Sequence, residues 1–374
     1  MKKILFITHD TTRSGAPIVL LNFIKWIKKN KSKTEVAVLS LRGGELKNEF
    51  RQVADKYFEL PGISFWTRIK NKIYGITGIQ NSRNNNISFV GKLARQDFDI
   101  VYSNTINSIP IAASLKHINK KIKFVAHIHE LQTVIDISLP NLSEFISHID
   151  FFLSPSEMVT QNLMFKYEIP QAKIETVYEF TKVRPYNDFK KLNAVFQVGA
   201  AGTAHWRKGH DVFLQVARYI KNHHPDLNIK FTWIGALPEM EKCTIDADIK
   251  KMNLENIVIF TGAKLDPEEF YRDFDIFLLT SREDPFPLVC IEVGMLGKPI
   301  ICFEKASGSA EVLNIGGGFV VPYLNIERMA EKVVFYYKNP GIMEQHGKEG
   351  QLQFSRFTPE NICPKIWSIL QGDL

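Results

Sequence analysis

Residues 280–302 read TSREDPFPLVCIEVGMLGKPIIC, and this stretch indicates the fold more strongly than any other part of the chain. The apolar run before it, Phe274–Leu279, has the composition of a buried strand. A proline-rich turn follows, then an apolar segment that contains Glu292, then Gly297-Lys298-Pro299 and a second apolar strand. Asp284, Glu292 and the backbone N–H groups of a helix start are therefore expected together at the C-terminal edge of a sheet, where α/β proteins bind nucleotides.

Strand-like and helix-like segments alternate on both sides of this stretch. Apolar residues recur at helical spacing over Ile18–Ile27 and Val212–Asn222. Short apolar runs predict strands at Ile4–Thr8, Glu35–Leu41, Phe98–Tyr102, Ile122–His127, Phe151–Ser154, Val195–Val198, Ile229–Ile234, Ile257–Phe260, Ile276–Leu279, Pro299–Phe303 and Gly318–Val321. Two such alternations predict an α/β protein with two doubly wound, Rossmann-like domains that face each other across a cleft.

The domain boundaries follow from a polar, proline-containing stretch near the middle of the chain. We expect an N-terminal domain over residues 1–182, a linker over 183–192 and a C-terminal domain over 193–355. A final helix is expected within 356–374, where the chain can cross back to the N-terminal domain.

Composition narrows the class of protein and its partners. With 374 residues, 45% hydrophobic and 23% charged, the chain is long enough for two cores. The formal net charge of +7 is spread along the sequence, which indicates either an ordinary solvated surface or attraction to a nucleotide phosphate, a lipid-linked phosphate or an anionic membrane. No nucleic-acid-binding module is recognisable, so no nucleic-acid partner is expected.

The cysteines and the N-terminus indicate the compartment. The four cysteines form no C-x-x-C pair, and Cys290 and Cys302 lie in apolar runs, so we expect core thiols in a reducing environment and no zinc site. His9 and Asp10 end the first apolar run after five residues, which is too short for a signal peptide. These features predict a cytoplasmic protein. Phe65–Tyr74 alternates aromatic and basic residues, which is typical either of contact with the inner face of the plasma membrane or of a packed surface helix.

Three further segments have compositions that suit ligand binding. Gly199–Gly209 follows a predicted strand and carries Arg207 and Lys208, which can neutralise a phosphate, although the loop is neither G-x-G-x-x-G nor a Walker A motif. The loop Thr12–Pro17 follows the first strand, and its backbone amides can bind an anion or hydroxyl groups. His127 and His129 lie on one face of a strand end; no third ligand is spaced nearby, so we predict polar cleft residues, or a buried His127, and no metal.

Taken together, these motifs make the chain similar to retaining glycosyltransferases of the GT-B fold, of the large family four type (glycosyl transferases group 1). The resemblance covers nearly the whole chain and rests on Ser14-Gly15-Ala16, His129-Glu130, Ser154-Pro155-Ser156-Glu157, Arg207-Lys208-Gly209, Tyr271 with Asp275-Ile276-Phe277, Ser281–Val289 and Gly308-Ser309-Ala310-Glu311.

The resemblance implies a role for each matching residue. Glu292 takes the place of the second acid of the family's Glu-x7-Glu motif and would hold the donor ribose, and Asp284 takes the place of the first and would contact the donor sugar. Lys208 matches the diphosphate lysine, and His129 matches a histidine near the donor sugar. The remaining predicted site residues are Gly15, Arg207, Pro287, Leu288 and Val289 for the donor, and Ser14, Ala16 and His127 for the acceptor or its junction with the donor.

Two positions depart from the family pattern. Asp284 is one methylene shorter than the family's glutamate, so its contacts to the sugar can shift or need a water. Gly202 stands where the family often has an arginine, six residues before Lys208, and Arg207 is the candidate to supply that charge.

The expected function is therefore transfer of a sugar, with retention, from a nucleotide sugar to a glycan or lipid-linked acceptor in bacterial surface polysaccharide synthesis. The resemblance implies no metal and no cofactor besides the nucleotide-sugar substrate. Two alternatives stay open: another GT-B enzyme, such as a sugar-nucleotide epimerase or a phosphorylase, and a non-catalytic nucleotide-sugar-binding partner.

Overall fold

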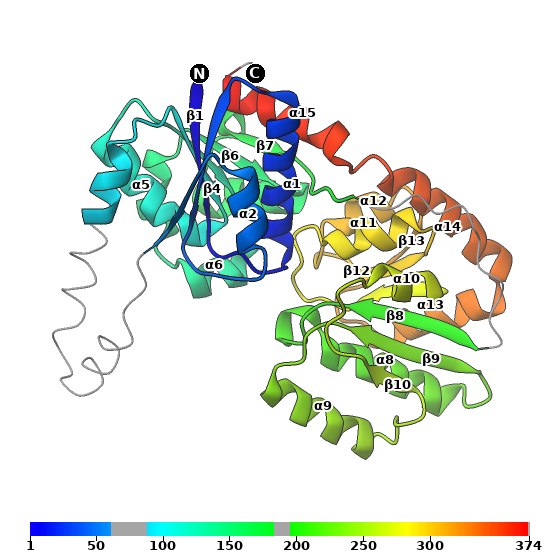
Figure 1. Ribbon diagram of the computed structural model, residues 1–374. Coiled ribbons are helices and arrows are strands. Elements are labelled where there is room, and N and C mark those ends of the chain that lie inside the picture. Colours follow the sequence, from blue (N-terminus) through cyan, green and yellow to red (C-terminus); the bar gives the residue numbers. More distant parts are fainter. Residues whose placement is uncertain (61–87, 183–194, 373–374) are drawn as a thin grey trace, which may run out of the picture. The chain divides into compact units, whose positions relative to one another are not determined.

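The computed structural model describes residues 1–60, 88–182 and 195–372 (Figure 1). The chain divides into two compact units. The first unit contains residues 1–155, 159–177 and 362–374, and the second contains 156–158 and 178–361. Each unit is an α/β structure with a parallel sheet between helices.

The first unit is built on a parallel sheet of seven strands within the described residues, in the order β3-β2-β1-β4-β5-β6-β7. The strands are β1 (Lys2–Thr8), β2 (Thr34–Ser40), β3 (Lys56–Glu59), β4 (Ile100–Asn104), β5 (Lys123–His127), β6 (Phe151–Ser154) and β7 (Ile174–Thr176). The strand order reverses beside β1, because β2 pairs with one side of β1 and β4 with the other. In doubly wound sheets, ligands bind at the carboxyl ends of the strands next to such a reversal.

Helices cover this sheet because each has one apolar face. In α1 (Gly15–Asn30) the buried residues recur at helical spacing, and Lys28 and Lys29 lie in the last turn, where cations favour the helix dipole. The other described α-helices that belong wholly or mostly to this unit are α2 (Lys47–Val53), α5 (Ile109–Ile118), α6 (Gln132–Ser138), α7 (Glu157–Tyr167) and α15 (Pro359–Gln371). The chain from Ile362 onward, including most of α15, belongs to this first unit.

The second unit has a parallel sheet of six strands within its described residues, in the order β10-β9-β8-β11-β12-β13. The order reverses beside β8, between β9 and β11. The strands are β8 (Phe196–Ala201), β9 (Ile229–Ile234), β10 (Val258–Phe260), β11 (Ile276–Leu279), β12 (Ile300–Phe303) and β13 (Gly318–Val321). The helices are α8 (His210–His223), α9 (Glu239–Lys251), α10 (Glu268–Asp273), α11 (Leu288–Met295), α12 (Ser309–Leu313), α13 (Ile326–Lys338) and α14 (Pro340–Phe354).

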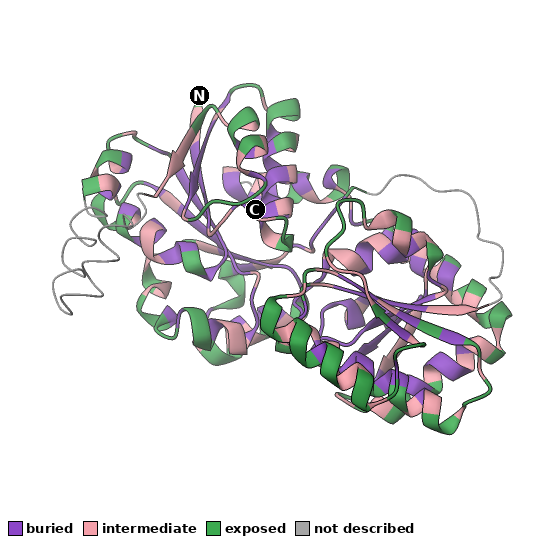
Figure 2. Ribbon diagram, turned by 60° about the horizontal axis from the view of Figure 1, so that its bottom comes forward, coloured by how far each residue is buried: buried purple, intermediate pink, exposed green. Residues whose placement is uncertain are grey.

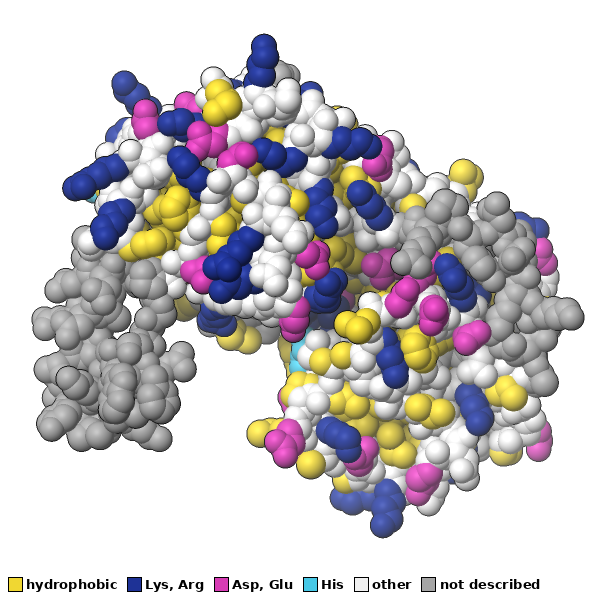
Figure 3. Space-filling model, in the orientation of Figure 1, with side chains coloured by type: hydrophobic (Ala, Val, Ile, Leu, Met, Phe, Trp, Pro, Cys, Tyr) yellow, Lys and Arg dark blue, Asp and Glu magenta, His cyan; other side chains and the backbone are white. Residues whose placement is uncertain are grey.

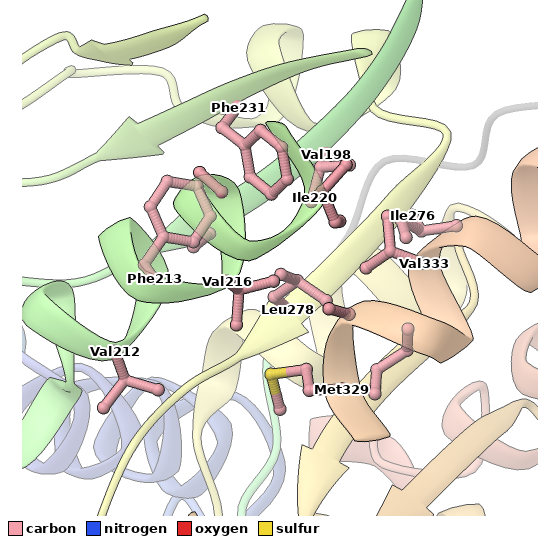
Figure 4. Close-up of a cluster of buried hydrophobic side chains, with 14 of the residues drawn as sticks. Val198, Val212, Phe213, Val216, Ile220, Phe231, Ile276, Leu278, Met329 and Val333 are labelled. Atoms are coloured by element: carbon pink, nitrogen blue, oxygen red, sulfur yellow. The ribbon is translucent and has the colours of Figure 1, made fainter. Parts of the chain in front are cut away.

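The core of the second unit fixes the strands that carry its polar loops. Side chains of α8 and α13 pack on the central strands, among them Phe213, Val216 and Met329 (Figure 4). Figure 2 shows the same pattern in both units, with buried residues on the strands and exposed residues on the outer faces of the helices. Rigidly held strand ends place the following loops in defined positions.

The predicted strands and the three predicted helices are all present, with ends that differ by a few residues. Two strands were missed. β3 is an edge strand whose residues are half-buried or exposed, and β7 has only three residues, so neither produces a clear apolar run. Cys290 and Cys302 are buried thiols, as predicted.

The formal net charge is divided unequally between the two units. The first unit carries 25 Lys and Arg against 15 Asp and Glu, whereas the second carries 22 against 25. Figure 3 shows side chains of both signs on each unit, with Lys and Arg prominent on the visible face of the first.

Two predicted segments lie outside the described residues: the aromatic and basic stretch Phe65–Tyr74 and the linker 183–192. Among the helices that the structure does describe, none has the length and apolar character needed to cross a bilayer.

Candidate functional site

In the second unit, the loop after β8 turns sharply so that Arg207 and Lys208 face the end of β11. A short 3-10 helix, Trp206–Lys208, is followed by Gly209 in the left-handed conformation with φ of +69°. A Cβ atom at Gly209 would lie 2.0 Å from the carbonyl oxygen of Thr280, so only glycine fits. The hydroxyl of Thr280 donates a hydrogen bond to the carbonyl of Lys208 at 3.2 Å, and Arg282 N–H donates to the carbonyl of Arg207 at 2.8 Å.

Three side chains meet where these two loops touch. Lys208 Nζ lies 2.5 Å from Asp284 Oδ2, and Arg207 Nη1 lies 3.4 Å from Asp284 Oδ1. Arg207 also donates to the carbonyl of Glu283 at 2.8 Å, and Ser281 Oγ donates to Asp284 Oδ2 at 3.1 Å. We call Arg207, Lys208 and Asp284 the cation cluster, because its three charges sum to one positive charge.

Burial and mutual attraction set the protonation of this cluster. Burial acts to raise the pKa of Asp284, but Lys208 and Arg207 outweigh it and hold that pKa below its ordinary value. Burial lowers the pKa of Lys208, although Asp284 acts in the opposite direction. Burial and the two neighbouring cations lower the pKa of His205 to about 4, so His205 is neutral at pH 7. The excess of one positive charge in the cation cluster favours an anion.

The start of α11 adds unpaired backbone donors to the same loop. Pro287 occupies the N-cap position with extended backbone, and within the described residues no side chain caps the helix. Leu288 and Val289 are the first two helical residues, and their N–H groups have no carbonyl partner within the helix. A helix start of this kind attracts negative charge.

Glu292 lies one turn further along α11 than Leu288. Its carboxylate is largely buried; burial and the negative charge of Glu268 raise its pKa to about 7, against a hydrogen bond from Thr181 that lowers it. Burial and Glu292 together raise the pKa of Tyr271. The two acids of the motif therefore differ in protonation. Asp284 in the loop has a lowered pKa, whereas Glu292 on the helix, eight positions later, has a pKa of about 7.

In the first unit, Ser14, Gly15 and Ala16 form the beginning of α1. Ser14 takes the N-cap position with extended backbone, and its hydroxyl lies 3.0 Å from Thr12 Oγ1 rather than capping the helix. The position of a Cβ atom on Gly15 has no atom within 4 Å among the described residues, so the chain can be approached closely there. Asp10 holds the loop, because its Oδ1 accepts from the N–H and the hydroxyl of Thr12 at 3.0 and 2.9 Å.

His127 and His129 lie at the end of β5 in the same unit, with ring centroids 3.9 Å apart. His127 is fully buried; its Nδ1 is 2.6 Å from the hydroxyl of Tyr102, and burial with the neighbouring His129 lowers its pKa well below the ordinary value. His129 is half-buried, and its Nε2 is 2.9 Å from Asn104 Oδ1. His127 therefore packs behind His129, which is the more accessible of the two.

Each unit thus brings its own predicted residues together: the cation cluster and the start of α11 in the second, and the start of α1 with the two histidines in the first. Sequence reasoning missed Ser281, His205 and Asn104. Ser281 and His205 lie inside motifs already recognised, but nothing in their spacing identifies their partners. Asn104 could have been found from its position at the end of β4, because β4 pairs with β5, the strand that ends at His127.

Comparison with known proteins places these features in context. Residues 195–339 match the family model described as glycosyl transferases group 1. An uncharacterized glycosyltransferase of Haemophilus influenzae is 28% identical over 164 residues, which is 44% of this chain and 45% of that protein. The N-acetyl-alpha-D-glucosaminyl L-malate synthase of Bacillus anthracis is 24% identical over 74% of this chain and 75% of its own length.

The capsular polysaccharide biosynthesis glycosyltransferase CapM of Staphylococcus aureus is 25% identical, over 55% of this chain and 50% of that protein. The matched region therefore spans about half the length of two of these three relatives. Among solved structures, Anabaena Alr3699/HepE in complex with UDP and glucose has a TM-score of 0.78 and 18% identity, covering 99% of this chain and 100% of that one. That likeness concerns the fold.

Proposed function

We propose that this chain is a glycosyltransferase that uses a nucleotide-sugar donor, because it has the GT-B fold and its residues 195–339 match the model of the glycosyl transferases group 1 family. The observation that carries the proposal is the cation cluster beside the start of α11. Positive charge and unpaired N–H groups in one loop region suit a diphosphate, which is the leaving group of such a donor.

On the donor side, Lys208 and Arg207 neutralise the diphosphate, and the N–H groups of Leu288 and Val289, after the turn at Pro287, donate to it or to the sugar. Asp284 accepts hydrogen bonds from sugar hydroxyls and keeps Lys208 in place between turnovers. When it is ionised, the carboxylate of Glu292 accepts hydrogen bonds from the two ribose hydroxyls. In the first unit, Gly15 lets the donor approach the backbone closely.

The proposed reaction is transfer with retention of configuration. The bond between the anomeric carbon and the diphosphate oxygen breaks, and the acceptor hydroxyl oxygen bonds to that carbon on the same face. The acceptor proton passes to the departing diphosphate. The cation cluster stabilises the charge that develops on the leaving group without a metal ion, and His129 contacts the donor sugar near the reacting carbon. Ser14, Ala16 and His127 line or support the junction with the acceptor.

For the acceptor, we propose a glycan or a lipid-linked precursor of a bacterial surface polysaccharide. CapM of S. aureus, a capsular polysaccharide biosynthesis glycosyltransferase, supports this context. The excess of Lys and Arg in the first unit supports contact with an anionic membrane at its cytoplasmic face.

The test is an assay of products with a panel of nucleotide sugars and extracted lipid-linked acceptors, analysed by mass spectrometry. Glycosyl transfer that persists in EDTA is expected. Formation of an epimerised donor or of a sugar phosphate would indicate another GT-B enzyme, and donor binding without turnover would indicate a binding partner.

Two variants tie that activity to the proposed residues. Asp284→Asn and Glu292→Gln are expected to lose most transfer while remaining folded. Glu269→Gln is the matched control, because Glu269 is an exposed acid on α10 of the same unit. Full activity in both Asp284→Asn and Glu292→Gln would reject the assignment of the site.

A further inference from the structure

Asn104 is a fully buried polar residue of the first unit that the proposed reaction does not yet use. It is the last residue of β4, paired in register with Thr8 of β1 on one side and with His127 of β5 on the other. Its side chain makes two hydrogen bonds. Nδ2 lies 3.0 Å from the carbonyl oxygen of Ala16, and Oδ1 lies 2.9 Å from Nε2 of His129.

The carbonyl of Ala16 determines which way the amide of Asn104 is turned. A carbonyl oxygen can only accept, so the NH₂ group of Asn104 must face Ala16. The amide oxygen then faces His129, and an amide oxygen can only accept. Nε2 of His129 must therefore carry a proton. In the neutral ring this fixes the tautomer in which Nδ1 is unprotonated and acts as an acceptor.

The same two bonds join two segments that are far apart in sequence. Ala16 lies in the first turn of α1, and His129 lies just after β5. Asn104 holds both through one rigid, buried amide at the end of the strand between them. A buried amide with both ends bonded is costly to displace, because each lost partner leaves a polar group unsatisfied away from water.

We propose that Asn104 is a positioning residue that fixes the tautomer and ring orientation of His129 and ties His129 to the start of α1. Only the expected effect on turnover rests on the proposed function. The tautomer itself follows from contacts within the first unit and exists in the protein without substrate.

The decisive variants are Asn104→Leu and Asn104→Asp. Leucine has a similar volume but makes neither hydrogen bond, so His129 is expected to populate both neutral tautomers. Aspartate keeps an acceptor for Nε2–H but loses the donor to Ala16, so the Nε2–H tautomer should persist. Ser103→Ala is the matched control, because it removes a buried hydroxyl from the preceding residue of β4 while leaving Asn104 in place.

The primary readout is ring ¹⁵N NMR of histidine-labelled full-length protein at a pH where His129 is neutral, with the signal of His129 identified by its loss in His129→Gln. We expect the Nε2–H tautomer in the natural protein, Ser103→Ala and Asn104→Asp, and a mixture in Asn104→Leu. Should the natural protein or Asn104→Asp carry the proton on Nδ1, or Asn104→Leu keep the Nε2–H tautomer alone, the inference is overturned.

The secondary readout is donor turnover. Asn104→Leu is expected to lower kcat by about 10–100-fold, by analogy with the loss seen when the hydrogen-bond partner of a metal-binding histidine is removed. Asn104→Asp should recover part of that loss, and Ser103→Ala should match the natural protein. If the natural protein turns over no nucleotide sugar, the proposed function fails while the NMR result still decides the tautomer. If the natural protein turns over a nucleotide sugar and Asn104→Leu does so with the same kcat, the positioning role is rejected.

Discussion

At the scale of single residues, the shared ion pairs of Asp284 explain why an aspartate can stand at this position. Its carboxylate is buried and accepts hydrogen bonds from Lys208, Arg207 and Ser281, which hold it close to the two cations. The shorter side chain suits this close pairing. Gly202 leaves room for the side chain of Lys208, because a Cβ atom at position 202 would lie only 3.2 Å from Lys208 Cδ.

Arg207 should neutralise part of the negative charge of the diphosphate. It would thereby replace the arginine that the family often has at the position of Gly202. Arg207→Ala is expected to weaken binding of the preferred nucleoside diphosphate by about tenfold, equivalent to about 1.4 kcal/mol. Isothermal titration calorimetry measures this directly. Lys230→Ala, which removes an exposed cation of β9 in the same unit, is the control. Affinity equal to that of the natural protein in Arg207→Ala would exclude Arg207 from the diphosphate site.

The raised pKa of Glu292 predicts that donor binding depends on pH. Ribose hydroxyls donate to the ionised carboxylate, so binding favours loss of the proton, and with a pKa of about 7 the affinity should rise between pH 6 and pH 8. Calorimetry in buffers of different ionisation enthalpy should detect proton release at pH 6.5. Glu292→Gln has no such proton, so its weaker affinity should not change across this range. A flat profile for the natural protein would contradict the role of Glu292.

The same shift predicts an effect on stability. Because folding raises this pKa from 4.5 to about 7, the contribution of Glu292 to stability is fully present below pH 4.5 and is lost as the pH rises through 7. Glu292→Gln should therefore unfold with a free energy about 1–3 kcal/mol higher than the natural protein at pH 8.5, and with nearly the same free energy at pH 4. Urea unfolding at both pH values measures the difference; an equal effect at both would refute the raised pKa.

At the scale of elements, the turn between β8 and α8 places the cations. Gly209→Ala would put a Cβ atom against the carbonyl of Thr280 in a backbone conformation that alanine disfavours. We expect it to destabilise the second unit by roughly 1–3 kcal/mol and to weaken diphosphate binding, because the peptide that holds Lys208 must move. Gly341→Ala is the control, since the site of its Cβ atom is open and its φ is ordinary.

Urea unfolding of the two glycine variants separates a local effect from a general one. Gly341→Ala should be neutral or slightly stabilising, because alanine is the better helix former near the start of α14. Equal stability of the Gly209 and Gly341 variants would mean that the turn can relax without cost.

The elements themselves could largely be predicted from the sequence, because long apolar runs and helical periodicity depend on neighbouring residues. Asp284 and Glu292 could be placed before and within a helix for the same reason. The partners of these residues could not be predicted. Lys208 reaches Asp284 across 76 positions, and that contact depends on β8 and β11 being adjacent in the sheet. Asn104 and His129 likewise meet only because β4 pairs with β5.

At the scale of the whole molecule, the difference in charge between the two units predicts how the protein meets an anionic surface. The first unit has an excess of ten basic residues over acidic ones, whereas the second has a deficit of three. The protein should therefore sediment with vesicles that contain anionic lipid at low salt and be released as salt screens the attraction.

Charge-reversal variants locate that attraction. Lys120 and Lys121 are exposed and precede β5 in the first unit, so the double change to glutamate should weaken vesicle binding. The control is the same double change at Lys250 and Lys251, which are exposed at the end of α9 in the second unit. It changes the net charge of the protein by the same amount. If the two double variants bind vesicles equally, net charge alone governs adsorption, and a basic first unit does not direct it.

The central claim is that the second unit holds the donor diphosphate at the cation cluster. The most direct test is a crystal structure of the full chain with the nucleoside diphosphate that binds most tightly in a panel of UDP, GDP, ADP and dTDP. We predict phosphate oxygens within hydrogen-bond distance of Lys208 Nζ and of the first N–H groups of α11, with the ribose hydroxyls on Glu292. A diphosphate bound elsewhere, with Lys208 still paired to Asp284 alone, would contradict the account.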